Sequence, residues 1–167
     1  MSKLIEKAYL YAKKAHGKQV RKYTGERYIS HPVAVAFTVA RTPEASDEMI
    51  VAALLHDVVE DTPYTLDAIR HNFGDDVAYL VDHLTDISKP EDGNRKARKK
   101  LDAKHTAKGD WRVHTIKVAD LISNTQSIKE HDPDFWKVYR REKEYLLSVL
   151  VDADPDLVKE AYDLIAD

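Results

Sequence analysis

Three acids and a histidine stand at the end of an otherwise apolar stretch of the chain. The segment Met49–Asp61 reads Met-Ile-Val-Ala-Ala-Leu-Leu-His-Asp-Val-Val-Glu-Asp, so its last two turns carry His56, Asp57, Glu60 and Asp61. At helical spacing these groups stack in two adjacent columns. A carboxylate withdrawn from water is destabilising unless a cation compensates its charge. The segment therefore indicates either a cation site or a helix end at which the acids are solvated.

Two further polar positions stand out against apolar surroundings. Asp120 interrupts the apolar pattern of residues 113–122, and Asn124 and Ser127 follow it on the same helical face. His31 stands directly before Pro32, at the expected start of another helix. Taken alone, Asp120 could be a surface or capping residue and His31 a core or capping histidine. They become candidate ligands only in combination with His56 and Asp57.

Together these positions supply two imidazoles and two carboxylates from three separate helices: His31, His56, Asp57 and Asp120. A nitrogen and oxygen ligand set without sulfur suits Mn²⁺, Fe²⁺ or a similar ion better than structural zinc. Such a site leaves positions for water or a substrate oxygen, and a bound water becomes a hydroxide-like nucleophile near neutral pH. Glu60 and Asp61 follow one turn later and could orient that water or move its proton. The residues thus predict metal-assisted hydrolysis of an anionic substrate.

The elements that must position these groups are predicted to be helices throughout. Apolar residues recur at helical spacing and strand-like alternation is nearly absent, which predicts an all-α fold of about eight or nine helices. We expect a single domain over residues 1–167. The helices are expected over residues 4–15, 31–41, 47–61, 66–73, 75–85, 95–107, 110–128, 134–151 and 156–166. Residues 18–30 and 88–94 are predicted loops.

Composition limits the class of protein. The 167 residues are 43% hydrophobic, which is enough for a packed core, and they contain no cysteine, which excludes disulfides and thiolate metal sites. No apolar run is long enough for a membrane span and no signal peptide is visible, so we expect a cytoplasmic protein without a membrane partner. The net charge is −3 and no nucleic-acid motif appears, which argues against a nucleic-acid partner.

Charge is segregated along the chain. Residues 1–28 hold eight Lys and Arg against two acids, residues 44–86 hold eleven acids against one base, and residues 89–108 hold eight bases against three acids. This pattern fits a basic rim around an acidic, cation-binding centre, or three differently charged solvated faces. The basic segment 95–108 is accordingly either a phosphate-attracting flap or a solvated face.

The order of these motifs resembles the HD phosphohydrolase superfamily, and more closely the hydrolase domain of RelA/SpoT-type alarmone enzymes. The similarity covers about residues 4–130. It rests on three segments: Ala15–Pro32, which reads AHGKQVRKYTGERYISHP; Leu54–Thr62, which reads LLHDVVEDT; and Trp111–Asp120, which reads WRVHTIKVAD. The central segment is the most specific of the three.

The resemblance implies an all-α hydrolase with one divalent ion, Mn²⁺. Its substrate would be guanosine 3′-diphosphate 5′-di- or triphosphate, (p)ppGpp, the nucleotide of the stringent response, from which it would remove the 3′-diphosphate by attack of metal-bound hydroxide. By matching position, the metal ligands would be His31, His56, Asp57 and Asp120. Glu60 and Asp61 would handle the attacking water, and Arg21, Lys22 and Asn124 would contact the nucleotide. With no synthetase or regulatory region in 167 residues, a stand-alone small hydrolase is expected.

Departures from the family pattern concern the substrate rather than the metal. After Asp120 the sequence continues Leu-Ile-Ser-Asn-Thr-Gln-Ser and keeps only Asn124 of the usual run, with Gln126 in place of an Arg. A nucleotidase or phosphatase acting on another phosphate ester, or a catalytically silent nucleotide-binding protein, therefore remains an alternative. The sequence leaves open the purine, the number of 5′-phosphates and the oligomeric state.

Overall fold

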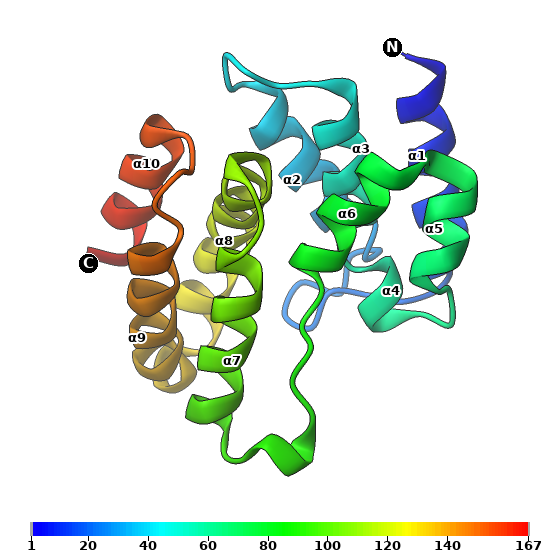
Figure 1. Ribbon diagram of the computed structural model, residues 1–167. Coiled ribbons are helices and arrows are strands. Elements are labelled where there is room, and N and C mark those ends of the chain that lie inside the picture. The colour runs from blue at the N-terminus through cyan, green and yellow to red at the C-terminus, as the bar shows by residue number, and fades with distance from the viewer. Residues whose placement is uncertain (1, 167) are drawn as a thin grey trace. The chain divides into compact units, whose positions relative to one another are not determined.

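A computed structural model describes residues 2–166, whose regular structure is helical apart from one isolated bridge between Val20 and Arg27 (Figure 1). The prediction of an all-α fold is confirmed. The chain divides into two compact units, one ending at Thr85 and the other beginning at Asp86. That residues 1–167 act as one domain stays a prediction.

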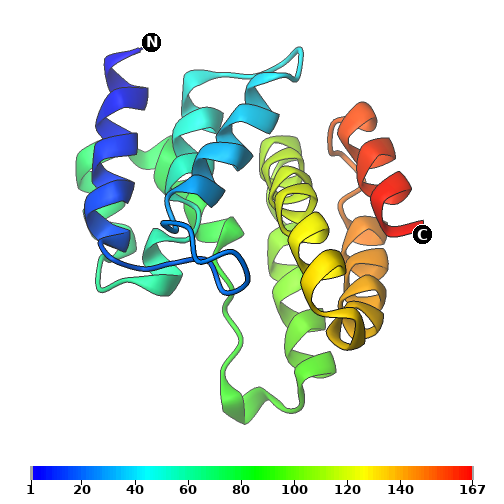
Figure 2. The same ribbon diagram turned by 180° about the vertical axis from the view of Figure 1, so that it is seen from behind.

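The first unit is built around α3. Its helices are α1 (Lys3–His16), α2 (Ser30–Ala40), α3 (Asp47–Leu55), α4 (Val58–Asp61), α5 (Leu66–Phe73) and α6 (Asp75–Leu84). Helix α3 packs against α1, α2 and α6, which explains why residues 51–55 are almost fully buried. The chain between α1 and α2 is a loop, visible in blue in Figure 2.

Local signals place the start of α3 and both ends of α5 where they were predicted, whereas α2 begins one residue early, at Ser30, without a side-chain cap. The hydroxyl of Thr65 accepts a hydrogen bond from the backbone N–H of Ala68 and begins α5. Gly74 ends that helix with φ +91°, a conformation that a residue with a Cβ rarely adopts. The hydroxyl of Ser46 caps α3 in the same way, by accepting from the N–H of Met49.

One helix of the first unit differs from its prediction. The helix expected over residues 47–61 is broken at His56 and Asp57, which separate α3 from the short α4. No glycine or proline marks this break in the sequence. The backbone of Asp57 has φ −98° and ψ −3°, in the sparsely populated region that many site residues occupy. The break therefore places the two most chemically informative residues of the segment in the turn between α3 and α4.

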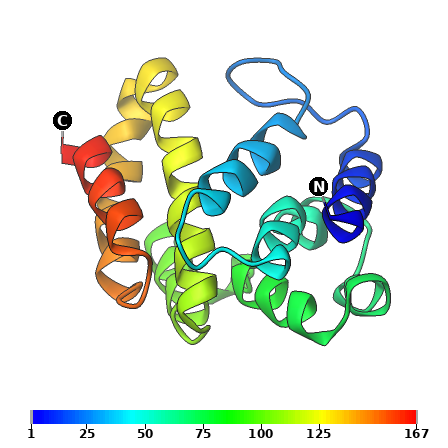
Figure 3. The same ribbon diagram turned by 90° about the horizontal axis from the view of Figure 1, so that it is seen from above.

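The second unit is built around α8. Its elements are the 3₁₀ turn η1 (Pro90–Asp92) and the helices α7 (Arg95–Ala107), α8 (Trp111–His131), α9 (Pro133–Val149) and α10 (Pro155–Ala166). Helix α8 contacts α7, α9 and α10, and Figure 3 shows these helices from above in yellow-green to red. The carboxylate of Asp110 caps α8 by accepting from the N–H groups of Arg112 and Val113.

Helix α8 runs three residues further than predicted, to His131 instead of residue 128. The carboxylate of Asp132 then begins α9 by accepting from the N–H of Phe135, and Pro133 takes the first position of that helix. None of the helices described between residues 2 and 166 has the length and apolarity that crossing a membrane requires.

Candidate metal centre

His31, His56 and Asp57 come together in the first unit. The Nε2 atom of His56 lies 3.0 Å from Oδ2 of Asp57, and Nε2 of His31 lies 3.6 Å from the same oxygen. One ligand atom from each of the three residues lies within 4.8 Å of the others. His31 and His56 are buried, and the Asp57 side chain is 18% exposed. The group could hold a metal ion that remains accessible from one side.

The orientation of His56 fits a metal ligand. Its Nδ1 lies 2.7 Å from the carbonyl oxygen of Ala53, and because a carbonyl can only accept, Nδ1 carries the proton. In the neutral ring the lone pair is then on Nε2, which faces the Asp57 carboxylate. Two electron-donating atoms 3.0 Å apart repel each other unless a cation or a proton lies between them. A carbonyl behind the ligating histidine is the usual outer support of a metal site.

Tyr28 is a member of this centre that the sequence interpretation did not single out. Its hydroxyl donates to Oδ2 of Asp57, and its ring lies edge-on to that of His31 with 5.8 Å between centroids. In the sequence, the one feature that could have pointed to Tyr28 is its position three residues before His31. Tyr28 reaches the centre because the bridge between Val20 and Arg27 folds the loop back on itself.

The predicted acid and base residues lie on α4, directly after Asp57. Glu60 and Asp61 are both exposed to solvent. Oδ2 of Asp61 accepts a hydrogen bond of 3.2 Å from the amide of Gln19. One alternative drawn from the sequence was that the acids at this helix end are solvated, and this holds for Glu60 and Asp61. His56, in the turn before α4, is buried.

The predicted nucleotide contacts Arg21 and Lys22 lie in the loop between α1 and α2. The Arg21 guanidinium is 5.9 Å from the centroid of the Tyr28 ring. The Lys22 ammonium is 3.2 Å from the Tyr23 hydroxyl and 4.7 Å from the centroid of the same ring. Arg21 therefore lies close to a residue that contacts Asp57, and Lys22 is exposed.

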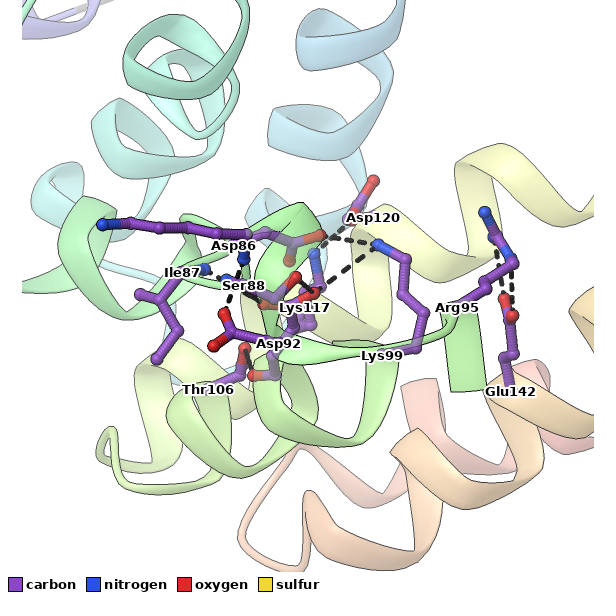
Figure 4. Close-up of polar contacts among 12 residues, drawn as sticks. Asp86, Ile87, Ser88, Asp92, Arg95, Lys99, Thr106, Lys117, Asp120 and Glu142 are labelled. Carbon is purple, nitrogen blue, oxygen red and sulfur yellow. Dashed lines mark hydrogen bonds and ion pairs between the residues drawn. The ribbon is translucent and has the colours of Figure 1, made fainter. Parts of the chain in front are cut away.

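The remaining two predicted residues belong to the second unit. Asp120 is buried on α8, where Asn124 donates to its Oδ1 over 2.8 Å. Lys117 lies 3.1 Å from its Oδ2 (Figure 4). Asp120 and Asn124 thus occupy one helical face, as their spacing predicted. The place of Asp120 in the ligand set stays a prediction.

A network of charges surrounds Asp120 within the second unit. Burial raises the pKa of Asp86, but the ammonium groups of Lys117 and Lys99 outweigh this effect and hold the pKa below its usual value. Lys99 lies 2.6 Å from Asp86 (Figure 4). Burial, and then the charge of Lys117, lower the pKa of Lys143 to about 8. These groups line a cavity of about 50 Å³.

Some charged side chains of the basic helix α7 interact with other residues of the second unit. Arg95 makes two hydrogen bonds, of 2.7 and 3.0 Å, to the carboxylate of Glu142 (Figure 4). Asp102 is buried and accepts from the backbone N–H groups of Ile87 and Ser88. Lys96 and Lys100 are exposed. Helix α7 therefore exposes some of its basic side chains to solvent and pairs others with acids of the second unit. A role of this helix in attracting phosphate stays a hypothesis.

Comparisons with known proteins agree with these findings. Residues 8–150 match the family model described as HD domain. A protein of Mycobacterium leprae named probable GTP pyrophosphokinase is 38% identical over 144 residues, which are 86% of this chain and 18% of the relative. A guanosine-3′,5′-bis(diphosphate) 3′-pyrophosphohydrolase of Aquifex aeolicus is 39% identical over 139 residues, which are 83% of this chain and 18% of the relative. This chain thus spans about a fifth of the length of these relatives.

A solved structure is similar over nearly the whole chain. It belongs to a metazoan ortholog of SpoT that is described as hydrolysing ppGpp. The TM-score is 0.88 and the sequence identity 26%, and the match covers 99% of this chain and 96% of that chain.

Proposed function

Because this chain belongs to the HD-domain family, we propose that it is a metal-dependent hydrolase that removes the 3′-diphosphate from (p)ppGpp or a related purine nucleotide. The proximity of His31, His56 and Asp57 is the observation that carries this proposal. The similarity to a 3′-pyrophosphohydrolase and to a SpoT ortholog supports the choice of reaction and substrate class.

We assign the metal to these three residues and propose Asp120 as the fourth ligand. Oxygen and imidazole donors without sulfur fit Mn²⁺. When bound, the ion acidifies water and offsets negative charge on the phosphate oxygens. The protein's part is to fix the donors: the Ala53 carbonyl holds His56, and the Tyr28 hydroxyl holds Asp57.

The acids on α4 act on the attacking water in this proposal. Glu60 and Asp61 are exposed and ionisable and follow Asp57 by three and four residues, so either can accept a proton from water. The new bond forms between the water oxygen and the phosphorus of the 3′-phosphate, and the bond between that phosphorus and the 3′ oxygen breaks. The 3′ oxygen takes up a proton. The products are pyrophosphate and a nucleoside 5′-di- or triphosphate with a free 3′-hydroxyl.

The nucleotide contacts are proposed from chemistry and position. Arg21 presents a planar guanidinium that can stack on a purine or bind phosphate, and Lys22 presents an exposed ammonium. Asn124 has an amide that can both donate and accept. The substitution of Gln126 for an arginine of the family pattern removes one charge from the region after Asp120, so the preferred purine has to be measured.

A nucleotide panel scored by product tests this function. The purified protein, loaded with Mn²⁺, is incubated with ppGpp, pppGpp, the adenine analogue and nucleoside monophosphates. Release of pyrophosphate from a 3′-diphosphate supports the proposal. Release of orthophosphate from a monophosphate would identify a nucleotidase instead, and tight binding without turnover would identify a silent nucleotide-binding protein.

A further inference from the structure

A buried histidine lies beside the metal centre without belonging to it. His16 is the last residue of α1 and is 5% exposed. It is neither one of the three residues that could hold a metal nor one of the acids on α4. Its side chain nevertheless contacts Gln19 and Tyr28, which in turn contact Asp61 and Asp57.

The first connection runs through Gln19 to Asp61. Nδ1 of His16 lies 2.9 Å from Oε1 of Gln19, and Nε2 of Gln19 donates to Oδ2 of Asp61 over 3.2 Å. A carboxylate can only accept, so the amide nitrogen must face Asp61 and the amide oxygen must face the imidazole. His16 therefore donates from Nδ1, and the direction of both hydrogen bonds is fixed by the charge on Asp61.

The second connection runs through Tyr28 to Asp57. The rings of His16 and Tyr28 are packed with 4.7 Å between centroids and 37° between planes. The hydroxyl of the same tyrosine donates to Oδ2 of Asp57. This ring contact involves neither nitrogen of His16, so the hydrogen bond from Tyr28 to Asp57 does not depend on the Nδ1 donor of His16.

The two nitrogens of His16 differ in their environment. Within the described part of the chain, Nε2 is buried and has no hydrogen-bond partner. The ring is therefore oriented by its Nδ1 donor and by packing, and a smaller side chain that keeps a donor at the Nδ1 position should retain its effect. Asparagine provides such a donor, and leucine has nearly the shape of asparagine but no donor.

We propose that His16 is a positioning residue that holds Gln19, and through it Asp61, in the orientation in which Asp61 acts with Glu60 on the attacking water. This inference rests on the proposed hydrolase function and adds a residue to it. His16 and Gln19 touch neither the reacting atoms nor the metal ligands directly. Losing either one should therefore slow the chemical step and leave the affinity for metal and nucleotide nearly unchanged.

The test compares the full-length parent with His16→Leu, His16→Asn and Gln19→Met at saturating Mn²⁺. We expect kcat to fall about tenfold in His16→Leu and in Gln19→Met, the effect of losing one oriented hydrogen bond, with KM within about twofold of the parent. His16→Asn should recover kcat to within about threefold of the parent. The double variant His16→Leu/Gln19→Met should be no slower than either single variant, because both remove the same connection.

Two kinetic results would overturn the inference. The first is an equal loss of kcat in His16→Asn and His16→Leu, which would show that the ring matters only for packing. The second is a double variant slower by the product of the single effects. If circular dichroism shows that His16→Leu does not fold, the test rests on Gln19→Met, which changes a half-buried side chain. A kcat of Gln19→Met equal to that of the parent then rejects the inference.

A measurement independent of turnover separates this inference from the proposed function. In the parent, the imidazole ¹H–¹⁵N spectrum of His16 should show the Nδ1–H tautomer, and Gln19→Met should abolish that preference. An Nε2–H tautomer in the parent would contradict the connection to Gln19. If the parent hydrolyses no nucleotide but shows the expected tautomer, the proposed function has failed while the connection has not.

Discussion

The Nε2 atom of His56 lies 3.0 Å from Oδ2 of Asp57, although the two residues are neighbours in the chain. In a regular helix adjacent side chains point roughly 100° apart. Both residues lie in the turn between α3 and α4, and Nε2 of His31 is 3.6 Å from the same oxygen of Asp57. The oxygen of Asp57 is thus the common neighbour of both imidazoles.

Replacing Asp57 tests the carboxylate itself. We expect Asp57→Asn, which keeps the shape but loses the negative charge, to weaken Mn²⁺ binding by more than about 100-fold, since even supporting residues of metal sites contribute 10–100-fold. Calorimetric titration of the metal-free protein measures this. Asp67→Asn, an exposed aspartate on α5, is the control and should bind as the parent does. Equal affinities of the parent and Asp57→Asn would contradict the assignment.

Replacing Tyr28 tests the support of Asp57. Tyr28→Phe removes only the hydroxyl that donates to Oδ2. We expect Mn²⁺ affinity to fall about 10–100-fold, the usual effect of losing an outer hydrogen bond at a metal site. The matched control is Tyr23→Phe in the same loop, whose hydroxyl contacts Lys22. If both variants bind metal equally well, Tyr28 does not orient the carboxylate.

Replacing Glu60 separates chemistry from metal binding. Glu60→Gln keeps the size and polarity of the side chain but cannot accept a proton as a carboxylate does. Loss of a general base lowers kcat by about 10²–10⁴-fold, and we expect a decrease in this range with unchanged Mn²⁺ affinity. Steady-state kinetics and metal titration on the same sample measure both. Loss of metal from Glu60→Gln would make the residue a ligand rather than a proton acceptor.

Lys143 predicts a pH dependence of stability in the second unit. Its pKa in the folded protein is lowered to about 8, mainly by burial and then by Lys117, against an ordinary value of 10.5. Between these values the unfolded chain binds more protons, so this residue makes stability rise as the pH rises from 8 to 10.5. Below pH 8 its buried charge destabilises the fold.

The comparison of the parent with Lys143→Met isolates this effect from other titrating groups. Urea unfolding should show the variant to be more stable than the parent at pH 7, by about 1–3 kcal/mol, and the difference should shrink at pH 10. Lys137→Met, an exposed lysine of the same helix, is the control. A difference between the parent and Lys143→Met that is the same at both pH values would show that the charge of Lys143 is not destabilising.

The sequence predicted what depends on local signals. Thr65 and Gly74 bound α5 as expected because a capping hydroxyl and a positive φ act within one turn of the chain. The segment 95–107 is a helix with the predicted bounds. The convergence of His31 with His56 and Asp57 could be anticipated because polar groups at the ends of apolar helices need a partner.

What the sequence could not predict depends on contacts between distant segments. The break at His56 and Asp57 has no local signal, because the surrounding residues favour a continuous helix. Tyr28 contacts Asp57, and Gln19 contacts Asp61, only through the fold of the loop between α1 and α2, which is closed by the bridge between Val20 and Arg27. The pattern of residue types in one sequence does not show how this loop folds back. Tyr28 and Gln19 could therefore not be identified as supporting residues from the sequence.

The most direct test of the metal centre is a crystal of the full-length protein grown with Mn²⁺ and measured at the manganese absorption edge. We expect one anomalous peak per chain, about 2.0–2.3 Å from Nε2 of His31, Nε2 of His56 and carboxylate oxygens of Asp57 and Asp120. A protein that shows no peak at His31, His56 and Asp57, or that binds manganese elsewhere, would contradict it.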